Sequence, residues 1–236
     1  MKIYELKIIL KLNKDLLLKD YISFISENIN YIFYNSIILR AIHEKKGFKP
    51  YVVGSIYPVA TKLKKYQKDR VYTLTLRTIA KNIADELQEA SRKATNLDFD
   101  ILYIKTNELK IGHIDSLYTI TPAVLTITND DKKIRYWTIE DDLLLLQKRI
   151  RDNLEKKYKE FFKKSVKAPE DMINFLSIEN QKPIVFDYKG GKIFANKFKI
   201  GFNSDEISQK LAKLSFGVGL LEKNSLGFGM VVRGKG

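Results

Sequence analysis

The stretch GVGLLEKNSLGFGMVV, residues 217–232, holds four of the chain's 12 glycines in two G-x-G pairs. Glycine serves where the backbone must take a positive φ or come close to a ligand. A dinucleotide-binding fingerprint is excluded, because it needs a strand, then glycines, then a helix, whereas here a helix precedes and a strand follows. Two interpretations remain. One is a helix C-cap at Gly217 that leads through a turn into an edge strand; the other is a loop whose N–H groups, with Lys223, Asn224 and Ser225, lie against a phosphate backbone.

The composition favours a nucleic-acid partner. Among 236 residues, 42 are Lys or Arg and 28 are Asp or Glu, which leaves a formal net charge of +14. Such a charge attracts phosphate-rich polymers or an anionic membrane surface, but no run approaches the roughly 20 apolar residues that span a bilayer. The first residues, MKIYELKIILKL, alternate like a strand rather than a signal peptide, and cysteine is absent. We therefore expect a cytoplasmic protein that binds nucleic acid, without disulfides or thiolate metal sites.

The first half of the chain reads as strand, helix, two strands, helix and strand. Ile22, Ile25, Ile29 and Phe33 recur at helical spacing and indicate one long helix over residues 14–42. The other expected elements are strands at 2–11, 49–58, 70–78 and 99–114 and a helix at 79–94. This β-α-β-β-α-β order is the split βαβ pattern of ferredoxin-like folds.

The second half repeats that order. The expected elements are a strand at 118–128 with a returning strand at 129–139, a helix at 140–164, a hairpin at 183–202 turning at Gly190-Gly191, a helix at 204–217 with Asn203 or Ser204 as N-cap, and a last strand at 227–234. We therefore predict an α+β fold of two tandem ferredoxin-like (RRM-like) domains, 1–118 and 119–236, with a C-terminal glycine-rich loop.

The paired glycines resemble a known family motif. Gly217-Val218-Gly219 and Gly227-Phe228-Gly229, with EKNSL between them, are similar to the C-terminal glycine-rich loop of the Cas6 family of CRISPR RNA-processing endoribonucleases, within the RAMP superfamily. Tandem ferredoxin-like domains and a basic charge agree with that resemblance. It implies cleavage of precursor CRISPR RNA within its repeats, without a metal or other cofactor. The partners to expect are repeat RNA, subunits of a CRISPR effector complex and a second copy of the chain.

The catalytic residues are assigned by the same resemblance. The segment HEKKGFKPY, residues 43–51, resembles the loop after the first helix of Cas6 enzymes, where a histidine precedes a glycine and a lysine. The resemblance therefore implies that His43 is the catalytic histidine and that Lys49 assists it. Tyr34 falls where several members carry a third catalytic residue, with Tyr31 as the alternative. The other histidine, His113, ends an expected strand and is interpreted as structural.

These residue types suit RNA cleavage. RNA carries its own nucleophile, the 2′-hydroxyl beside the scissile phosphate, so the enzyme needs a proton acceptor, a cation and a proton donor. Histidine, with an ordinary pKa of about 6.5, exchanges protons near neutrality. A lysine supplies positive charge for the phosphorane, and a tyrosine hydroxyl can hold an oxygen by a hydrogen bond. The expected products carry a 2′,3′-cyclic phosphate and a 5′-hydroxyl.

The residues expected to contact RNA come from the glycine stretch and from the basic hairpin. The residues expected to contact RNA are Gly217, Gly219, Lys223, Asn224, Ser225, Gly227 and Gly229 in the glycine stretch, and Lys192 and Lys197 in the basic hairpin. We expect the hairpin to protrude as a basic ribbon. No metal site is expected, since the acidic clusters Asp130-Asp131 and 140–142 fall at a turn and a helix start. The alternatives are a non-catalytic RNA-binding subunit of an effector complex and an unrelated basic nucleic-acid-binding module.

Overall fold

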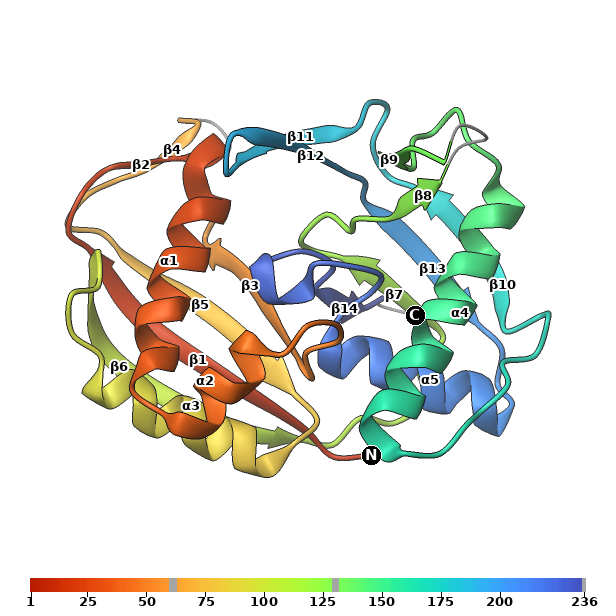
Figure 1. The fold of residues 1–236 in the computed structure, drawn as a ribbon, viewed down its shortest axis with the longest axis horizontal. Helices are drawn as coiled ribbons and strands as arrows, with labels where there is room; N and C mark the ends of the chain where they lie inside the picture. The colour runs from red at the N-terminus through yellow and green to blue at the C-terminus, as the bar shows by residue number, and fades with distance from the viewer. Residues whose placement is uncertain (60–62, 129–131, 235–236) are drawn as a thin grey trace.

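A computed structural model of the chain describes residues 1–59, 63–128 and 132–234, so Asp130 and Asp131 lie outside the described residues. Two antiparallel four-stranded sheets stand side by side, the first built from the N-terminal half and the second from the C-terminal half (Figure 1). The chain is thus an α+β protein, as predicted. None of the helices in the described ranges is long and apolar enough to cross a membrane.

The first sheet has the strand order β3-β5-β1-β6. Its strands are β1 (Ile3–Leu12), β3 (Tyr51–Tyr57), β5 (Val71–Thr78) and β6 (Phe99–Leu109), and its helices are α1 (Tyr21–Tyr34), α2 (Ile37–Glu44) and α3 (Lys81–Lys93). A short pair, β2 (Leu16–Leu17) and β4 (Lys65–Tyr66), lies beside them. Alternation in β1 turns Leu6, Ile8 and Leu10 toward the core, where they meet the apolar faces of α1 and α3.

The expected single helix over residues 14–42 is wrong, because the structure contains two helices. The first begins only at Tyr21, after a 3-10 turn, and it ends at Tyr34. Ser36 then caps α2, its hydroxyl accepting the Leu39 N–H at 3.2 Å. Asn and Ser favour such breaks because their side chains compete for backbone hydrogen bonds. His43 consequently lies in the last turn of α2 rather than in a loop.

The second sheet has the strand order β10-β13-β7-β14, which corresponds position by position to the order of the first. Its strands are β7 (Ser116–Thr119), β10 (Ile173–Ile178), β13 (Phe198–Phe202) and β14 (Val231–Arg233), and its helices are α4 (Leu143–Phe162) and α5 (Glu206–Val218). Two hairpins are added, β8 (Thr126–Thr128) with β9 (Ile134–Tyr136), and β11 (Ile184–Tyr188) with β12 (Gly191–Ala195). The order of elements along the chain therefore repeats that of the first half, as β7, α4, β10, β13, α5 and β14.

Several local predictions in this half need correction. The strand expected at 118–128 ends at Thr119, and the sheet takes its second strand from residues 173–178, which the sequence pattern did not reveal. Asp205, not Asn203 or Ser204, caps α5 by accepting the N–H groups of Ile207 and Ser208. Of the hairpin predicted at 183–202, only residues 184–195 pair with each other, and the turn is one residue earlier than expected, at Lys189-Gly190. Residues 198–202 belong instead to the second sheet, as β13.

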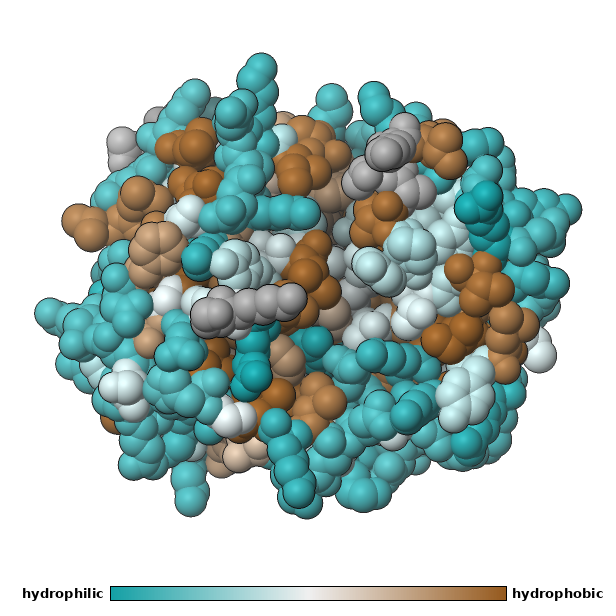
Figure 2. All heavy atoms as spheres, turned by 180° about the vertical axis from the view of Figure 1, so that it is seen from behind, coloured by the Kyte–Doolittle hydropathy of each residue, from teal (hydrophilic) through white to brown (hydrophobic). Residues whose placement is uncertain are grey.

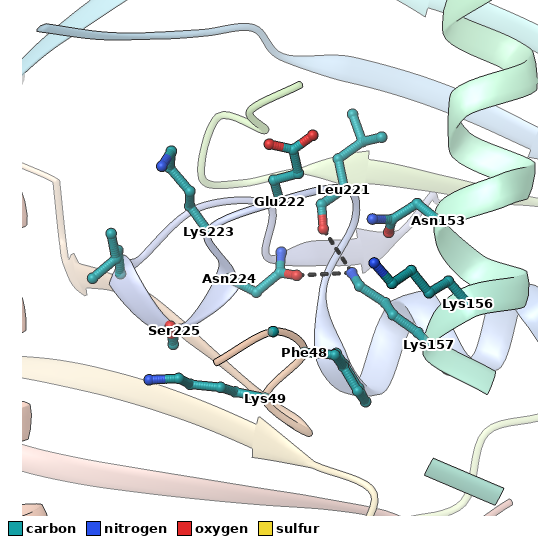
Figure 3. Close-up of a pocket in the computed structure, with 12 residues that line it drawn as sticks. Phe48, Lys49, Asn153, Lys156, Lys157, Leu221, Glu222, Lys223, Asn224 and Ser225 are labelled. Carbon is teal, nitrogen blue, oxygen red and sulfur yellow. Dashed lines mark hydrogen bonds between the residues drawn. The ribbon is translucent and has the colours of Figure 1, made fainter. Parts of the chain in front are cut away.

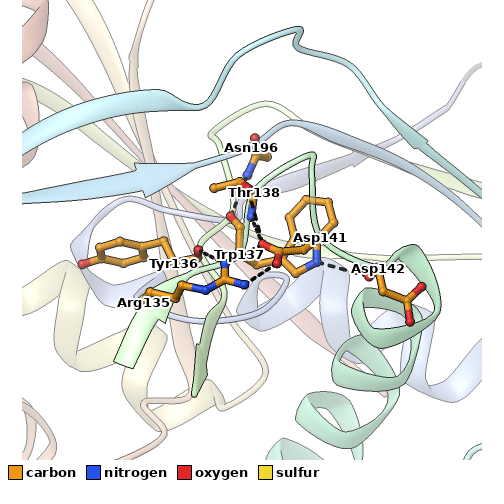
Figure 4. A network of polar contacts seen from close by, with 7 residues as sticks. All are labelled: Arg135, Tyr136, Trp137, Thr138, Asp141, Asp142 and Asn196. Carbon is orange, nitrogen blue, oxygen red and sulfur yellow. Dashed lines mark hydrogen bonds and ion pairs between the residues drawn. The ribbon is translucent and has the colours of Figure 1, made fainter. Parts of the chain in front are cut away.

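The acidic cluster at 140–142 has a structural role. Asp141 pairs with Arg135 and accepts the Thr138 N–H at 2.7 Å. The indole Nε1 of the buried Trp137 donates to the Asp142 carbonyl at 3.3 Å, and the Asn196 amide donates to the Trp137 carbonyl (Figure 4). This network joins the β8–β9 hairpin to the start of α4.

The two halves are joined through buried contacts. Arg77 on β5 donates to Glu5 at 2.8 Å and to the Val231 carbonyl at 2.6 Å, and its guanidinium lies 4.0 Å from the ring centroid of Phe216. Phe228 of the glycine stretch belongs to the hydrophobic core of the first half. The residues that follow α5 are therefore packed between the two sheets.

The β11–β12 hairpin reaches across to α1 and does not protrude freely (Figure 1). Phe186 packs edge-on against Tyr21 with ring centroids 5.6 Å apart, and the Tyr188 hydroxyl lies 3.2 Å from that of Ser26. The expectation of a protruding ribbon is wrong because apolar side chains on one face of the hairpin are buried against the first half.

Candidate active site

A cavity of about 450 Å³ opens between the loop after α2, helix α4 and the segment that follows α5 (Figure 3). Its lining includes four lysines, Lys49, Lys156, Lys157 and Lys223, and one carboxylate, Glu222. An excess of positive charge in a concave site raises the local concentration of anions. The cavity is therefore suited to a phosphodiester.

His43 and Lys49 lie together at the end of α2. The Lys49 ammonium donates to the His43 carbonyl at 2.5 Å, and the His43 ring stands edge-on to Phe33 with centroids 6.0 Å apart. Burial holds the pKa of His43 below its ordinary value, and the charges of Lys49 and Lys189 act in the same direction. At neutral pH the imidazole is therefore mostly neutral and able to accept a proton. Lys49 lines the cavity, whereas His43 is not among the lining residues and is reached by Lys49 through its main-chain carbonyl.

The structure does not bring the tyrosines into the same contact. Tyr34 is 62% exposed, its ring lies 5.6 Å from the Arg40 guanidinium, and Arg40 donates to its carbonyl. Tyr31 is 46% exposed. Among the described residues, neither tyrosine hydroxyl hydrogen-bonds to His43 or Lys49. Arg40, three residues before His43 on α2 and so on the same side of the helix, was not singled out from the sequence.

The glycine-rich loop, residues 219–229, is packed inside the protein. All four paired glycines are buried. Gly217 lies within α5, so the predicted C-cap there is wrong, and the cap is Gly219 with φ +86°. A Cβ on Gly229, at φ +69°, would come within 2.1 Å of the Leu220 carbonyl oxygen. A Cβ would also clash at Gly217 and Gly219, whereas Gly227 has room for one and takes a φ of +98°. Packing and backbone conformation thus account for these glycines, and their predicted approach to RNA is not needed to explain them.

Asn224 joins the two ends of this loop. Its amide nitrogen donates to the carbonyls of Leu220 at 2.9 Å and Phe228 at 3.1 Å. Its amide oxygen accepts a hydrogen bond from Lys157 at 2.8 Å. Every polar atom of the Asn224 side chain is therefore engaged within the protein, and this residue acts as part of the scaffold of the cavity.

Lys157 was missed by the sequence reading. It is buried on α4 and also donates to the carbonyls of Gly219 and Leu221, both at 2.7 Å. A signal was present in the sequence: Leu146, Ile150 and Leu154 form the buried stripe of α4, and Lys157 takes the next position of that stripe. A lysine at such a position has to find partners inside the protein.

The remaining predicted residues are spread over two surfaces. Lys223 and Ser225 are half-buried and line the cavity, with Ser225 beside the buried Tyr51. Lys192 is exposed near the tip of the hairpin, whereas Lys197 is half-buried in a different depression. The lysine of the hairpin whose charge acts on His43 is Lys189, which the sequence reading did not assign.

That second depression, of about 550 Å³, crosses the open faces of the two sheets. It lies on the side seen in Figure 2, where pale and brown side chains run between teal rims. Its lining includes Lys7, Tyr57, Thr73, Thr75, Ile120 and Lys197. Tyr57 is 69% exposed there. Exposed aromatic rings among lysines form the kind of surface on which unpaired bases stack.

No group of three or more His, Cys, Asp or Glu side chains in the described ranges is placed to hold a metal ion.

Gly229→Ala is expected to lower the free energy of unfolding by about 2 kcal/mol or more, because the new methyl meets the Leu220 carbonyl and the Asn224 amide in a strained backbone conformation. Urea unfolding followed by fluorescence of Trp137 measures the change. Gly112→Ala is the matched control, since a Cβ there meets nothing within 4 Å, and a shift below about 0.5 kcal/mol is expected. Equal shifts in both variants would contradict the packing argument.

Comparison with known proteins identifies the family. Residues 104–232 match the family model described as "CRISPR associated protein Cas6, C-terminal", which covers more than half of the chain. No curated protein sequence matches.

Solved structures share the fold over the full length. One described as "CRISPR associated protein Cas6" has 17% identity and a TM-score of 0.68, covering 99% of this chain and 100% of its own. Another, "An RAMP protein binding different RNA substrates", has 21% identity and a TM-score of 0.69, covering 100% of both chains. A Cas6-related protein from Pyrococcus furiosus has 22% identity and a TM-score of 0.64, covering 100% of this chain and 98% of its own. The chain therefore belongs to the Cas6 family of CRISPR-associated proteins.

Proposed function

We propose that this chain is an endoribonuclease that binds CRISPR repeat RNA and cleaves precursor CRISPR RNA within its repeats. The observation that carries the proposal is the pairing of His43 with Lys49 beside a lysine-lined cavity that the glycine-rich loop completes. Membership of the Cas6 family and the RNA-binding RAMP protein among the similar structures support it.

In the proposed reaction, the neutral imidazole of His43 accepts the proton of the 2′-hydroxyl. The 2′-oxygen forms a bond to the adjacent phosphorus, the bond from phosphorus to the 5′-oxygen breaks, and the 5′-oxygen takes a proton from water. The Lys49 ammonium offsets the negative charge that grows on the phosphoryl oxygens. The products carry a 2′,3′-cyclic phosphate and a 5′-hydroxyl, and no metal is consumed or required. Tyr34, or Tyr31 in its place, supplies a hydroxyl that holds a substrate oxygen.

We also infer that each half is a ferredoxin-like domain, since element order and strand order repeat between them. The first domain carries His43 and Lys49, and the second carries the glycine-rich loop. Because β7 pairs with β13 and β14, the boundary between them is placed before Ser116 rather than after residue 118.

We infer two RNA contacts. Lys223 and Ser225 hold the backbone near the scissile phosphate, with Lys189 and Lys192 at the hairpin tip flanking it. The depression across the open sheet faces, with Tyr57 and Lys197, holds an unpaired segment of the repeat.

The decisive experiment uses labelled cognate repeat RNA in excess EDTA, beside an RNA with a single 2′-deoxy nucleotide at the cut. Cleavage of the first RNA alone, with a 2′,3′-cyclic phosphate end, is the expected result. Tight binding without cleavage of either RNA would replace the proposal with the alternative, a non-catalytic repeat-RNA-binding subunit of an effector complex.

A further inference from the structure

The ammonium group of Lys157 has all of its hydrogen-bonding capacity occupied. A lysine has three N–H donors and no acceptor, and Lys157 directs them to Gly219 O, Leu221 O and Asn224 Oδ1 at 2.7–2.8 Å. Figure 3 shows the bonds to Leu221 and Asn224. Among the described residues, no carboxylate lies within ion-pair distance of it. No donor is left for a phosphate, so Lys157 differs from the other lysines of the cavity, and all three of its hydrogen bonds go to the glycine-rich loop.

Burying this group without a paired anion is unfavourable, because the ammonium loses its hydration. Burial lowers the pKa of Lys157 to about 7, and the carboxylate of Glu222 opposes that shift. Three carbonyl-type oxygens replace the lost water. A methionine or leucine would continue the apolar stripe of α4 without losing the hydration of a charge. The lysine must therefore be explained by the hydrogen bonds that it makes to the loop.

The three acceptors lie at successive points along the loop, and the contacts extend beyond them. Asn224, which accepts from Lys157, donates to Leu220 O and Phe228 O and so closes the loop on itself. Within the loop, the Leu220 N–H donates to Gly229 O, and the Gly229 N–H donates to Pro122 O, outside the loop. One ammonium group on α4 therefore hydrogen-bonds to three points of residues 219–229, and one of its partners, Asn224, bonds to both ends of the loop.

We propose that Lys157 is a positioning residue: it ties the glycine-rich loop to α4 in the shape that places Lys223 and Ser225 in the wall of the cavity beside Lys49. The part of this inference that concerns RNA rests on the proposed function, whereas the part that concerns loop order does not. Lys157 touches no substrate and acts through the loop.

The test compares the wild-type chain with three variants. Lys157→Met removes the charge and keeps the length of the side chain. Lys148→Met, the matched control, removes an exposed lysine from the same helix that does not line the cavity. Lys157→Cys introduces the only thiol of a chain that has no cysteine, so alkylation of the unfolded protein with 2-bromoethylamine, followed by refolding, restores an ammonium at this position alone.

Hydrogen exchange of peptides covering residues 219–229 is the first readout, and affinity for repeat RNA is the second. We expect exchange at Leu220, Glu222 and Gly229, whose N–H groups are hydrogen-bonded, to accelerate about tenfold or more in Lys157→Met. Exchange should be unchanged in Lys148→Met and slow again in the aminoethylated protein. Affinity for repeat RNA should fall about tenfold in Lys157→Met and recover on aminoethylation.

Unchanged exchange in Lys157→Met would overturn the inference. Faster exchange with unaltered RNA affinity and cleavage would overturn the link between loop order and RNA. A wild-type chain that does not bind repeat RNA would refute the proposed function, while the exchange results would still decide the role of Lys157.

If Lys157→Met does not fold, Asn224→Ala gives the second test, because it removes one acceptor of Lys157 and both of the hydrogen bonds that close the loop. Faster exchange at Leu220 and Gly229 in that variant supports the inference, and unchanged exchange refutes it.

Discussion

His43→Ala is expected to slow single-turnover cleavage of repeat RNA by about 10²–10⁴-fold, the range that a positioned acid or base contributes. Affinity for the RNA should change little, because the lysines of the cavity remain in place. His113→Ala is the matched control, since the chain has only two histidines and His113 is exposed near Asp115. Rates are measured by gel separation of labelled RNA with enzyme in excess.

The pH profile of the wild-type chain tests the same role. A general base works in its neutral form, so the rate should fall about tenfold per pH unit below the pKa of His43 and level off above it. Burial and the charge of Lys49 lower that pKa, so the plateau should begin below the ordinary histidine value of about 6.5. A rate that falls as pH rises from 5 to 7 would instead make the protonated imidazole the active form. A His43→Ala variant that loses RNA binding would make the residue structural.

Arg77→Ala is expected to lower the free energy of unfolding by about 3–5 kcal/mol, the cost of breaking a buried ion pair from one side. Arg77 and Glu5 are both buried, and the guanidinium also holds Val231 O and lies over Phe216. Removing it leaves Lys7, at 3.4 Å, as the one ion-pair partner of Glu5 among the described residues, and it removes the contacts from β5 to Phe216 on α5 and to Val231 on β14. The loss should appear in urea denaturation.

Lys2→Ala gives the comparison for a solvent-exposed pair. Lys2 pairs with Glu108 at 3.1 Å on the surface, and such pairs contribute at most about 1 kcal/mol. A loss of similar size in both variants would show that Arg77 does not join the two halves.

Much of the fold could be predicted from the sequence, because the patterns that indicate strands and helices are local. Alternation in residues 3–12 and the helical spacing of Ile22, Ile25, Ile29 and Phe33 reflect periods of two and 3.6 residues, which the chain obeys wherever one face is buried. The positive-φ turn of the basic hairpin follows from its glycine. His43 and Lys49 are six residues apart, so the end of helix α2 is enough to bring them into contact.

The contacts that tertiary structure alone decided join residues far apart in the chain. Lys157 meets Gly219 across 62 positions, and Arg77 meets Val231 across 154. No periodicity encodes which oxygen a buried ammonium will find. That choice depends on how α4 and α5 pack on the second sheet. The glycines were conspicuous in the sequence, but the reason for them was not. At Gly217, Gly219 and Gly229 the protein's own side chains and carbonyls, brought close by packing, occupy the space that a Cβ would need.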